Sequence, residues 1–264
     1  MLAANEAVGE TLDRAKASVL FRVHEEPDAD KVKDFAELAW SLGLKLPETE
    51  LTPSWFAGVL DMSKGEPAEY VVNNLLLRTM QRARYTPTNY GHFGLAADYY
   101  IHFTSPIRRY PDLVAHRVMQ NLLLHRSVKK TGQGRILPDG VSPEAAGAFL
   151  SARERVAVEA ERDVQARLAA LYLRDKITEH FDAVISGVTS FGLFVELLDC
   201  LISGAVPVQE MEDDYYRYDS KGHKLVGERT GKVRRLGDPV RVQLDQVDML
   251  TRKINFSLLE KGRE

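Results

Sequence analysis

The chain contains 264 residues, of which 44% are hydrophobic, and this is enough apolar material for one large domain or two ordinary ones. Its formal net charge of -3 argues against general adhesion to polyanions, and no stretch approaches the roughly 18 apolar residues of a membrane helix. With Cys200 as the single cysteine and no secretory signal pattern at the N-terminus, we expect a soluble cytoplasmic protein without internal disulfides or a cysteine-based zinc site.

Hydrophobic spacing predicts a mainly helical first part of the chain. The expected elements are, in chain order, a helix in the stretch 28–48 that is stopped by Gly43 and then Pro47, a helix at 67–84, an irregular loop leading into a short strand at 85–103, a helix at 110–126, a polar loop at 129–140 and a long helix at 142–180. Pro111 and Pro143 fall in the first turn of the last two helices, where the missing N–H costs little.

After residue 180 the pattern changes to alternating or apolar runs at 181–197, 201–208 and 238–259. Such runs, separated by glycine and polar turns, predict a small all-β domain of about five strands, for which a five-stranded barrel of the OB type is the natural candidate. We therefore expect an α+β protein with a mixed helical and β domain at 1–180 and an OB-fold β-barrel at 181–264.

Positive charge is concentrated in residues 78–126, which hold 7 basic and 2 acidic side chains. The stretch HFTSPIRRYPDLVAHR places Arg108 and Arg109 directly before a helix. Because a guanidinium is a planar fork, these arginines either bind an anionic ligand or pair with a carboxylate such as Asp112. Three further arginines of this segment are expected on one helical stretch: Arg78, Arg82 and Arg84.

In the predicted barrel, SFGLFVEL places Phe191 and Phe194 on either side of a glycine. An outward-facing phenylalanine would give a platform on which a nucleic-acid base can stack, and Arg252 and Lys253, expected on the last strand, would add positive charge. The alternative is that both phenylalanines lie in the barrel core.

Several blocks carry a resemblance to a known family. GVTSFGLFVEL and the later RKINFSLLE look like the S1-type RNA-binding OB module. MLAANEAV, YTPTNYGHFGLAADYYIHFTSPIRRYPDLVAHR and VEAERDV look like successive blocks of the catalytic RNB domain of the ribonuclease II and ribonuclease R family. The resemblance covers almost the whole chain and implies hydrolytic, processive 3′-to-5′ degradation of RNA to nucleoside 5′-monophosphates.

The resemblance also implies roles for single residues of the TSPIRRY block. Arg108 matches the catalytic arginine of the family, and Arg109 is expected to contact the RNA backbone or fix the loop. Thr104 and Ser105 would hydrogen-bond a phosphate or simply cap the turn. His102 lies beside aromatic residues and is expected to be a hydrogen-bonded structural residue rather than a general base.

Glu161 matches a family glutamate that lies near the terminal base of the RNA. The alternative is a salt bridge between Glu161 and a neighbouring arginine, Arg155 or Arg162. Asn5 and Glu6 match positions close to the active channel, without an assigned role.

The sequence departs from the family pattern in its metal ligands. The family holds Mg²⁺ on a cluster of aspartates upstream of the block that matches MLAANEAV, whereas Asp61, Asp98 and Asp112 are scattered in a way that does not gather carboxylates on one metal. The chain thus resembles the later half of an RNB domain followed by an S1-type domain, without the N-terminal cold-shock modules. We expect Mg²⁺ to be held outside this chain, and the isolated chain to be inactive.

Two alternatives to the exoribonuclease interpretation remain. The chain could be a non-catalytic module that binds single-stranded RNA, or an assembly factor that binds structured RNA on ribosomes. The expected partner is the 3′ end of single-stranded RNA, with ribosome-associated RNA and trans-translation factors as further candidates. No membrane partner is expected.

Overall fold

The computed structural model describes residues 1–41, 44–47, 51–65, 69–125, 137–138, 140–211, 213–219 and 222–259. Most of the polar loop expected at 129–140, and the glycine expected to stop the first helix, lie outside these residues. Within the described ranges no helix is long and apolar enough to cross a membrane. The chain divides into two compact units, and each is described by itself: one comprises 1–33, 47–59 and 76–159, and the other 34–46, 60–75 and 160–264.

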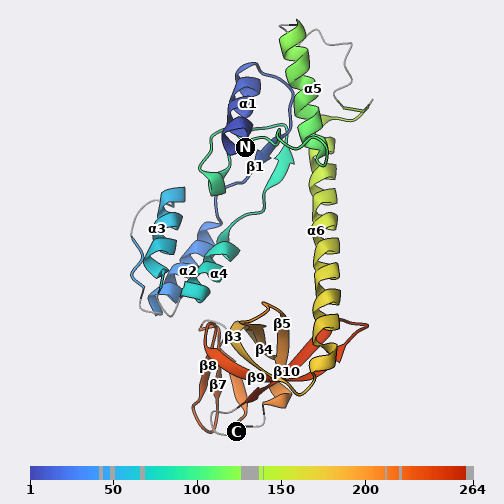
Figure 1. Ribbon diagram of the computed structural model, residues 1–264. Helices are drawn as coiled ribbons and strands as arrows, with labels where there is room; N and C mark the ends of the chain where they lie inside the picture. Colours follow the sequence, from blue (N-terminus) through green and yellow to red (C-terminus); the bar gives the residue numbers. More distant parts are fainter. Residues whose placement is uncertain are drawn as a thin grey trace. The chain divides into compact units, whose positions relative to one another are not determined.

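The predicted helices are all present, and two of them, those expected at 67–84 and 142–180, end earlier than expected (Figure 1). The helices are α1 (Leu2–Arg14), α2 (Ala29–Ser41), α3 (Pro53–Ser63), α4 (Glu69–Thr79), α5 (Tyr110–His125) and α6 (Pro143–Leu173). Two of them, α1 and α3, were not predicted. Arg82 and Arg84 were expected on the same helix as Arg78. They lie outside α4, because the helix ends at Thr79 and Arg84 begins a strand.

The first unit also contains a small sheet in which β1 (Phe21–Val23) pairs antiparallel with β2 (Arg84–Thr86). A single 3-10 turn, η1 (Phe93–Leu95), follows in the segment that was expected to be irregular. Isolated bridges connect Phe21 to Ile101 and His24 to His92, so the short strand expected in this segment is reduced to single bridges.

One apolar cluster contains residues from both sides of the segment with Arg108 and Arg109. Leu12 of α1, Phe21 of β1, Ile101 and Val114 of α5 are each at most 3% exposed and belong to this cluster. Ile101 precedes the motif and Val114 follows it. The burial of apolar surface therefore anchors both ends of the segment that carries Arg108 and Arg109.

The second unit contains the predicted five-stranded closed barrel, which confirms the α+β fold class. Its strands are β3 (His180–Thr189), β4 (Gly192–Leu197), β5 (Ser203–Pro207), β9 (Pro239–Asp248) and β10 (Lys253–Leu259). Their order around the barrel is β10-β5-β4-β3-β9, and the pairing of β10 with β5 is parallel. The interior is filled by alternate side chains of these strands, such as Ile185, Val195, Leu244 and Phe256, each fully buried. The domain boundary near residue 180 stays a prediction.

A second sheet of three strands was not predicted. It consists of β6 (Tyr216–Asp219), β7 (Lys224–Gly227) and β8 (Val233–Arg235), joined in antiparallel order. The carboxylate of Asp214 ties the turn between β7 and β8 to the residues before β6, because it accepts hydrogen bonds from the backbone N–H groups of Tyr215, Arg229 and Thr230. These polar strands have little of the apolar alternation by which strands are recognised in a sequence.

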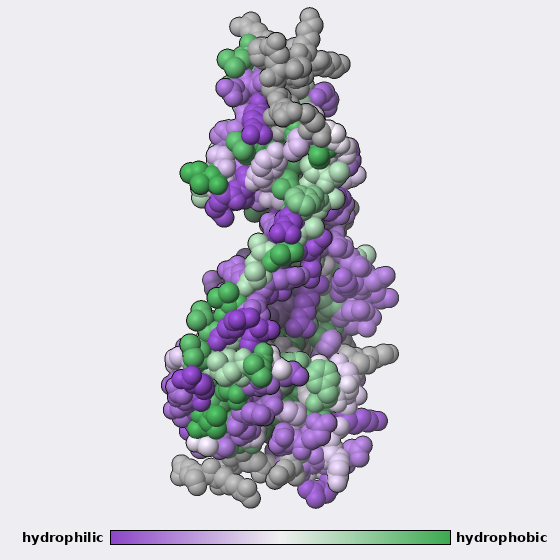
Figure 2. Space-filling model, turned by 90° about the vertical axis from the view of Figure 1, so that its right-hand side faces the viewer, coloured by the Kyte–Doolittle hydropathy of each residue, from purple (hydrophilic) through white to green (hydrophobic). Residues whose placement is uncertain are grey.

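Polar and apolar side chains are mixed on the surface. On the face drawn in Figure 2, hydrophilic residues predominate and hydrophobic residues form smaller groups between them. The long helix α6 contributes to this mixture, since Phe149, Val156 and Leu168 are exposed beside its charged residues.

Candidate functional site

The segment between His102 and α5 folds into a turn, called the arginine turn below, which is closed by hydrogen bonds within its own backbone. The carbonyl oxygen of Ser105 accepts hydrogen bonds from the N–H groups of Arg108, at 3.3 Å, and Arg109, at 3.1 Å. From the other side, the N–H of Ser105 donates to Oδ1 of Asp112 at 2.7 Å. The turn is thus fixed at both backbone polar groups of Ser105, its N–H and its carbonyl oxygen.

The two arginines of the turn have different environments. Nη2 of Arg109 lies 2.8 Å from Oδ1 of Asp112, whose side chain is fully buried, while the side chain of Arg109 is 21% exposed. Arg108 is exposed, and its guanidinium has no ion-pair partner among the described residues. The carboxylate pairing that the sequence left open therefore occurs at Arg109, and Arg108 is left facing solvent.

Thr104 and Ser105 are partly buried beside the turn. Across the ranges that the structure describes, neither hydroxyl has a hydrogen-bond partner, although the backbone of Ser105 is engaged as described above. Their expected contact with a phosphate stays a prediction, and the alternative of a capping hydroxyl finds no bond in support.

The histidine of the motif is a structural residue, as predicted. Nδ1 of His102 and the hydroxyl of Tyr85 are hydrogen-bonded at 2.8 Å. Burial, and next the positive charge of Arg109, lower the pKa of His102 to about 4, and burial raises the pKa of Tyr85 to about 12. The imidazole is therefore neutral at pH 7, and we infer that the tyrosine donates its proton to Nδ1.

Asn5 connects α1 to the residues that precede the turn, a function that the sequence did not indicate. Its Oδ1 accepts a hydrogen bond from the N–H of Phe103 at 3.1 Å, and its Nδ2 donates to the hydroxyl of Tyr100 at 3.0 Å. The side chain is only 3% exposed. Asn5 therefore helps to hold the segment before the turn, whereas no hydrogen bond or ion pair of the Glu6 side chain is found among the described residues.

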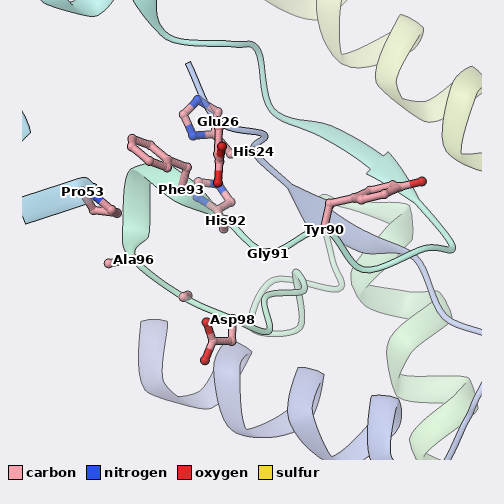
Figure 3. A pocket seen from close by; sticks show the side chains of 10 residues that line it. His24, Glu26, Pro53, Tyr90, Gly91, His92, Phe93, Ala96 and Asp98 are labelled. Carbon is pink, nitrogen blue, oxygen red and sulfur yellow. The ribbon is translucent and has the colours of Figure 1, made fainter. Parts of the chain in front are cut away.

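An open pocket of about 340 Å³ also lies in the first unit, and it contains none of the predicted site residues (Figure 3). His24 lines this pocket, and its Nδ1 accepts a hydrogen bond from the N–H of Gly94. Its Nε2 lies 2.7 Å from the carbonyl oxygen of Gln81. Both ring nitrogens of His24 are thus used by the fold. Burial, with the neighbouring His24 as a further cause, lowers the pKa of His92 to about 4.

The two phenylalanines of the barrel lie on its surface, so the alternative that they are core residues is wrong. Phe191 is 59% exposed and Phe194 is 38% exposed. Their rings meet edge to face, with centroids 5.9 Å apart. Phe194 rests on Gly187 of the neighbouring strand, where an added Cβ would lie 3.2 Å from the ring. The pair forms an exposed aromatic platform, which is the kind of surface on which bases stack.

Strand register places Lys253 on the same side of the barrel as Phe194. Phe194 is opposite Ala205, and Ala205 is opposite Asn255. Because side chains two residues apart on a strand point to the same face, Lys253 and Asn255 share the outer face with Phe194. Lys253 is exposed and is paired in register with Asp248 on β9.

Arg252 was expected on the last strand, but it lies in the turn before that strand. Its φ is 59°, a left-handed conformation, and β10 begins at Lys253. Nη1 of Arg252 lies 2.9 Å from Oδ1 of Asp163 on α6. This guanidinium is therefore held by a carboxylate, and its contact with RNA stays a prediction.

Glu161 is exposed on α6. No ion pair of Glu161 with Arg155 or Arg162 is found in the described part of the chain, so the salt-bridge alternative has no support. Its contact with a terminal base stays a prediction.

The described residues do not fit a metal site. No group of three or more histidine, cysteine, aspartate or glutamate side chains is placed to hold an ion in this part of the protein. Asp112, one of the scattered aspartates, is buried and engaged by Arg109 and Ser105.

Two family models match the chain. Residues 1–125 match the RNB domain, and residues 174–259 match the S1 RNA binding domain. The first range contains the arginine turn, and the second contains the aromatic platform. The RNB family is metal-dependent.

Ribonuclease R of Aquifex aeolicus is 43% identical over 262 residues, which are 99% of this chain and 36% of that protein. Ribonuclease R of Escherichia coli is 41% identical over 271 residues, covering 100% of this chain and 33% of that protein. The chain therefore spans about a third of the length of these relatives.

Solved structures of RNase R are also similar to this chain over nearly its whole length. Mycoplasma genitalium RNase R in complex with ribose methylated single-stranded RNA has a TM-score of 0.87 and 29% identity, covering 98% of this chain and 40% of that one. The same enzyme in complex with double-stranded RNA has a TM-score of 0.77 and 26% identity, with the same coverage. The chain therefore belongs to the RNB family, as a homologue of the part of ribonuclease R that joins RNB-domain sequence to an S1 RNA binding domain.

Proposed function

We propose that this chain is the RNA-holding part of a 3′-to-5′ exoribonuclease that hydrolyses single-stranded or structured RNA processively to nucleoside 5′-monophosphates in the cytoplasm. The observation that carries the proposal is the exposed guanidinium of Arg108, on a turn whose backbone is fixed by hydrogen bonds. This turn lies inside the segment that matches the RNB domain.

Arg108 suits the charge that develops when a phosphodiester is cleaved. Negative charge grows on the phosphoryl oxygens, and a planar guanidinium can donate to two of them at once. A fixed backbone keeps this donor in place, so little reorganisation is needed when the charge appears. Arg109 cannot do the same without giving up the carboxylate of Asp112.

The barrel supplies affinity for the RNA. Base stacking on an aromatic side chain contributes about 1–3 kcal/mol per base and tolerates any sequence, because every base has a π-face. Phe191 and Phe194 offer such a surface, with Lys253 on the same face of the barrel. The relative from M. genitalium binds both single-stranded and double-stranded RNA, which supports RNA as the ligand here.

The metal on which the family depends would be held outside the described residues of this chain, which offer no site for it. Mg²⁺ is the ion that the resemblance implies. We expect the isolated chain to bind RNA without cleaving it. Ribosome-associated RNA and trans-translation factors are candidate partners on the strength of the resemblance alone.

A second candidate function is a non-catalytic module for single-stranded RNA. The lack of a metal cluster among the described residues favours it for the chain by itself. The two functions differ in the importance of Arg108, since a binding module has no need for an exposed arginine on a turn fixed by hydrogen bonds.

The test is degradation of a 5′-labelled single-stranded oligoribonucleotide in Mg²⁺. Two proteins are compared: the chain alone, and a hybrid enzyme in which the chain replaces the matching 262 residues of the A. aeolicus ribonuclease R. The hybrid is also made with Arg108→Ala and, as a matched control, with Arg82→Ala, an exposed arginine of the basic segment outside the turn.

We expect the chain alone to bind the RNA and leave it intact, and the hybrid to shorten it progressively from the 3′ end with release of 5′-monophosphates. Arg108→Ala should abolish most of this activity, whereas Arg82→Ala should retain it. Cleavage by the chain alone, or a folded hybrid that only binds RNA, would contradict the proposal.

A further inference from the structure

The carboxylate of Asp112 is the most deeply buried charged group in the described part of the chain, and it is connected to the turn at two points. Its side chain is fully buried, and its Oδ1 accepts hydrogen bonds from the N–H of Ser105, at 2.7 Å, and from Nη2 of Arg109, at 2.8 Å. Burying a carboxylate costs free energy unless it is paired and hydrogen-bonded, so the loss of either contact would be unfavourable.

The geometry points to Asp112 as a positioning residue for Arg108: by holding Ser105 and Arg109, the Asp112 carboxylate sets the place of the guanidinium between them. This inference rests on the proposed role of Arg108. Asp112 itself does not touch the RNA.

The connection from Asp112 to Arg108 runs through the backbone. Asp112 fixes the N–H of Ser105, and the carbonyl oxygen of Ser105 in turn accepts from the N–H of Arg108. On the other side of Arg108, the side chain of Arg109 is tied to the same carboxylate oxygen. Arg108 therefore lies between two residues that Asp112 holds.

Asp112 comes third in α5, whose first residues are Tyr110 and Pro111. A carboxylate in the first turn of a helix is favoured by the helix dipole. The helix that begins here is anchored in the apolar cluster by Val114 and Val118, at 1% and 0% exposure. The carboxylate thus transmits the position of a rigid helix to the turn before it.

The exposure of Ile107 also indicates that hydrogen bonds, and not apolar packing, fix the turn. Its side chain is fully exposed, although it is the residue next to Arg108. The apolar side chain at the tip of the turn contributes no burial that would fix the arginine. The hydrogen bonds of Ser105 and Asp112 are the described contacts that do.

The test uses the hybrid enzyme defined above, with Asp112→Asn as the main variant. Asparagine keeps the volume and can still accept from Ser105, but it removes the charge that holds Arg109. We expect kcat to fall on the order of 10-fold to 100-fold, because a misplacement of about 1 Å can cost that much in an active site. KM should change little, since the barrel supplies the affinity. Asp28→Asn is the matched control, because Asp28 also accepts backbone N–H groups at a helix start, that of α2.

A double-mutant cycle separates positioning from general stability. If Asp112 acts through Arg108, the Asp112→Asn substitution should lower kcat in the enzyme with Arg108 and have almost no further effect in the Arg108→Ala background. A purely structural role would give the same fractional loss in both backgrounds, and that result would overturn the inference.

The outcomes also distinguish this inference from the proposed function. If Arg108→Ala leaves kcat unchanged, the proposed function fails. If Arg108→Ala abolishes activity while Asp112→Asn has wild-type kcat and an unchanged thermal melt, the inference about Asp112 alone fails. Should Asp112→Asn not fold, the double variant Arg109→Gln with Asp112→Asn, which removes both charges of the ion pair, takes its place in the cycle with the same expected results.

Discussion

The arginine turn and the barrel surface expose their candidate functional side chains by different means. In the turn, hydrogen bonds and one buried ion pair fix an irregular backbone, and they leave one arginine in solvent. In the barrel, regular strand pairing turns Phe194 outward, and Phe191 is exposed beside it in the turn between β3 and β4. The comparison teaches that the turn is built for position and the barrel for contact area. We therefore expect mutations in the turn to change rate, and mutations on the barrel surface to change affinity.

The largest expected effect is on the rate, at Arg108. Arg108→Lys keeps the positive charge but loses the planar fork, and in the hybrid enzyme kcat should fall by roughly two orders of magnitude or more, as when a positioned transition-state donor is removed. Single-turnover degradation measures this directly. Wild-type turnover in Arg108→Lys would show that the geometry of the guanidinium is not needed.

The next effect concerns the stability of the barrel. Gly192 separates the two phenylalanines with a φ of 151°, and an added Cβ would collide with the carbonyl oxygen of Val206. Gly192→Ala should therefore destabilise the barrel by more than the roughly 1–3 kcal/mol that a strained backbone conformation costs by itself. Chemical denaturation of the variant checks this. Gly231→Ala, which also has positive φ but open space around it, is the control that isolates the collision.

Acid should affect the first unit more than the barrel. His92 and His102 have pKa values lowered from 6.5 to about 4, chiefly by burial, so the unfolded chain takes up protons that the folded unit does not. The resulting stability is fully present above pH 6.5 and is lost as the pH falls towards 4.

Hydrogen exchange measured at pH 7 and pH 5, corrected for the intrinsic pH dependence of the exchange rate, resolves the two units. Protection of peptides from residues 85–103 should decrease at pH 5, while that of peptides from β9 and β10 should stay nearly constant. Equal loss of protection in both regions would show that the buried histidines are not the cause.

How far the sequence predicts these regions depends on what determines each structure. The barrel follows from alternating apolar residues, so its five strands and the α+β class could be predicted, and the helices α2, α4, α5 and α6 from their spacing. The three strands β6 to β8 could not, because they show little apolar alternation and the turn between β7 and β8 is held by the carboxylate of Asp214.

The candidate site was predictable in part. The TSPIRRY block predicted where the arginines lie, but not that Asp112 would hold Arg109 and leave Arg108 free of a partner among the described residues. That distinction depends on the backbone of Ser105, which has no signature in a sequence. Arg252 was misplaced because a left-handed turn residue and a strand residue look alike when they are neighbours in the chain.

The smallest expected effect is electrostatic. Lys253 contributes one exposed positive charge on the face that carries Phe194, and Asp248 is its register partner. Lys253→Ala should therefore weaken RNA binding only slightly at low salt and reduce the slope of log affinity against log salt concentration by at most about 0.7, the value for one phosphate of a single strand. A titration at several salt concentrations measures the slope. An unchanged slope would place Lys253 outside the RNA-binding face.

The most direct test of the division between rate and affinity is the dissociation constant of the 264-residue chain for a short single-stranded oligoribonucleotide, measured by fluorescence anisotropy. Phe194→Ala should weaken binding about 5-fold or more, since stacking contributes about 1–3 kcal/mol per base, and its thermal melt should stay unchanged because the ring is exposed. Tyr215→Ala, an exposed aromatic of the same unit at the three-stranded sheet, should bind as wild type. Arg108→Ala should change the dissociation constant less than about 2-fold. If Arg108→Ala weakens binding as much as Phe194→Ala does, or if Phe194→Ala has no effect, the division between a turn that sets rate and a barrel that sets affinity is wrong.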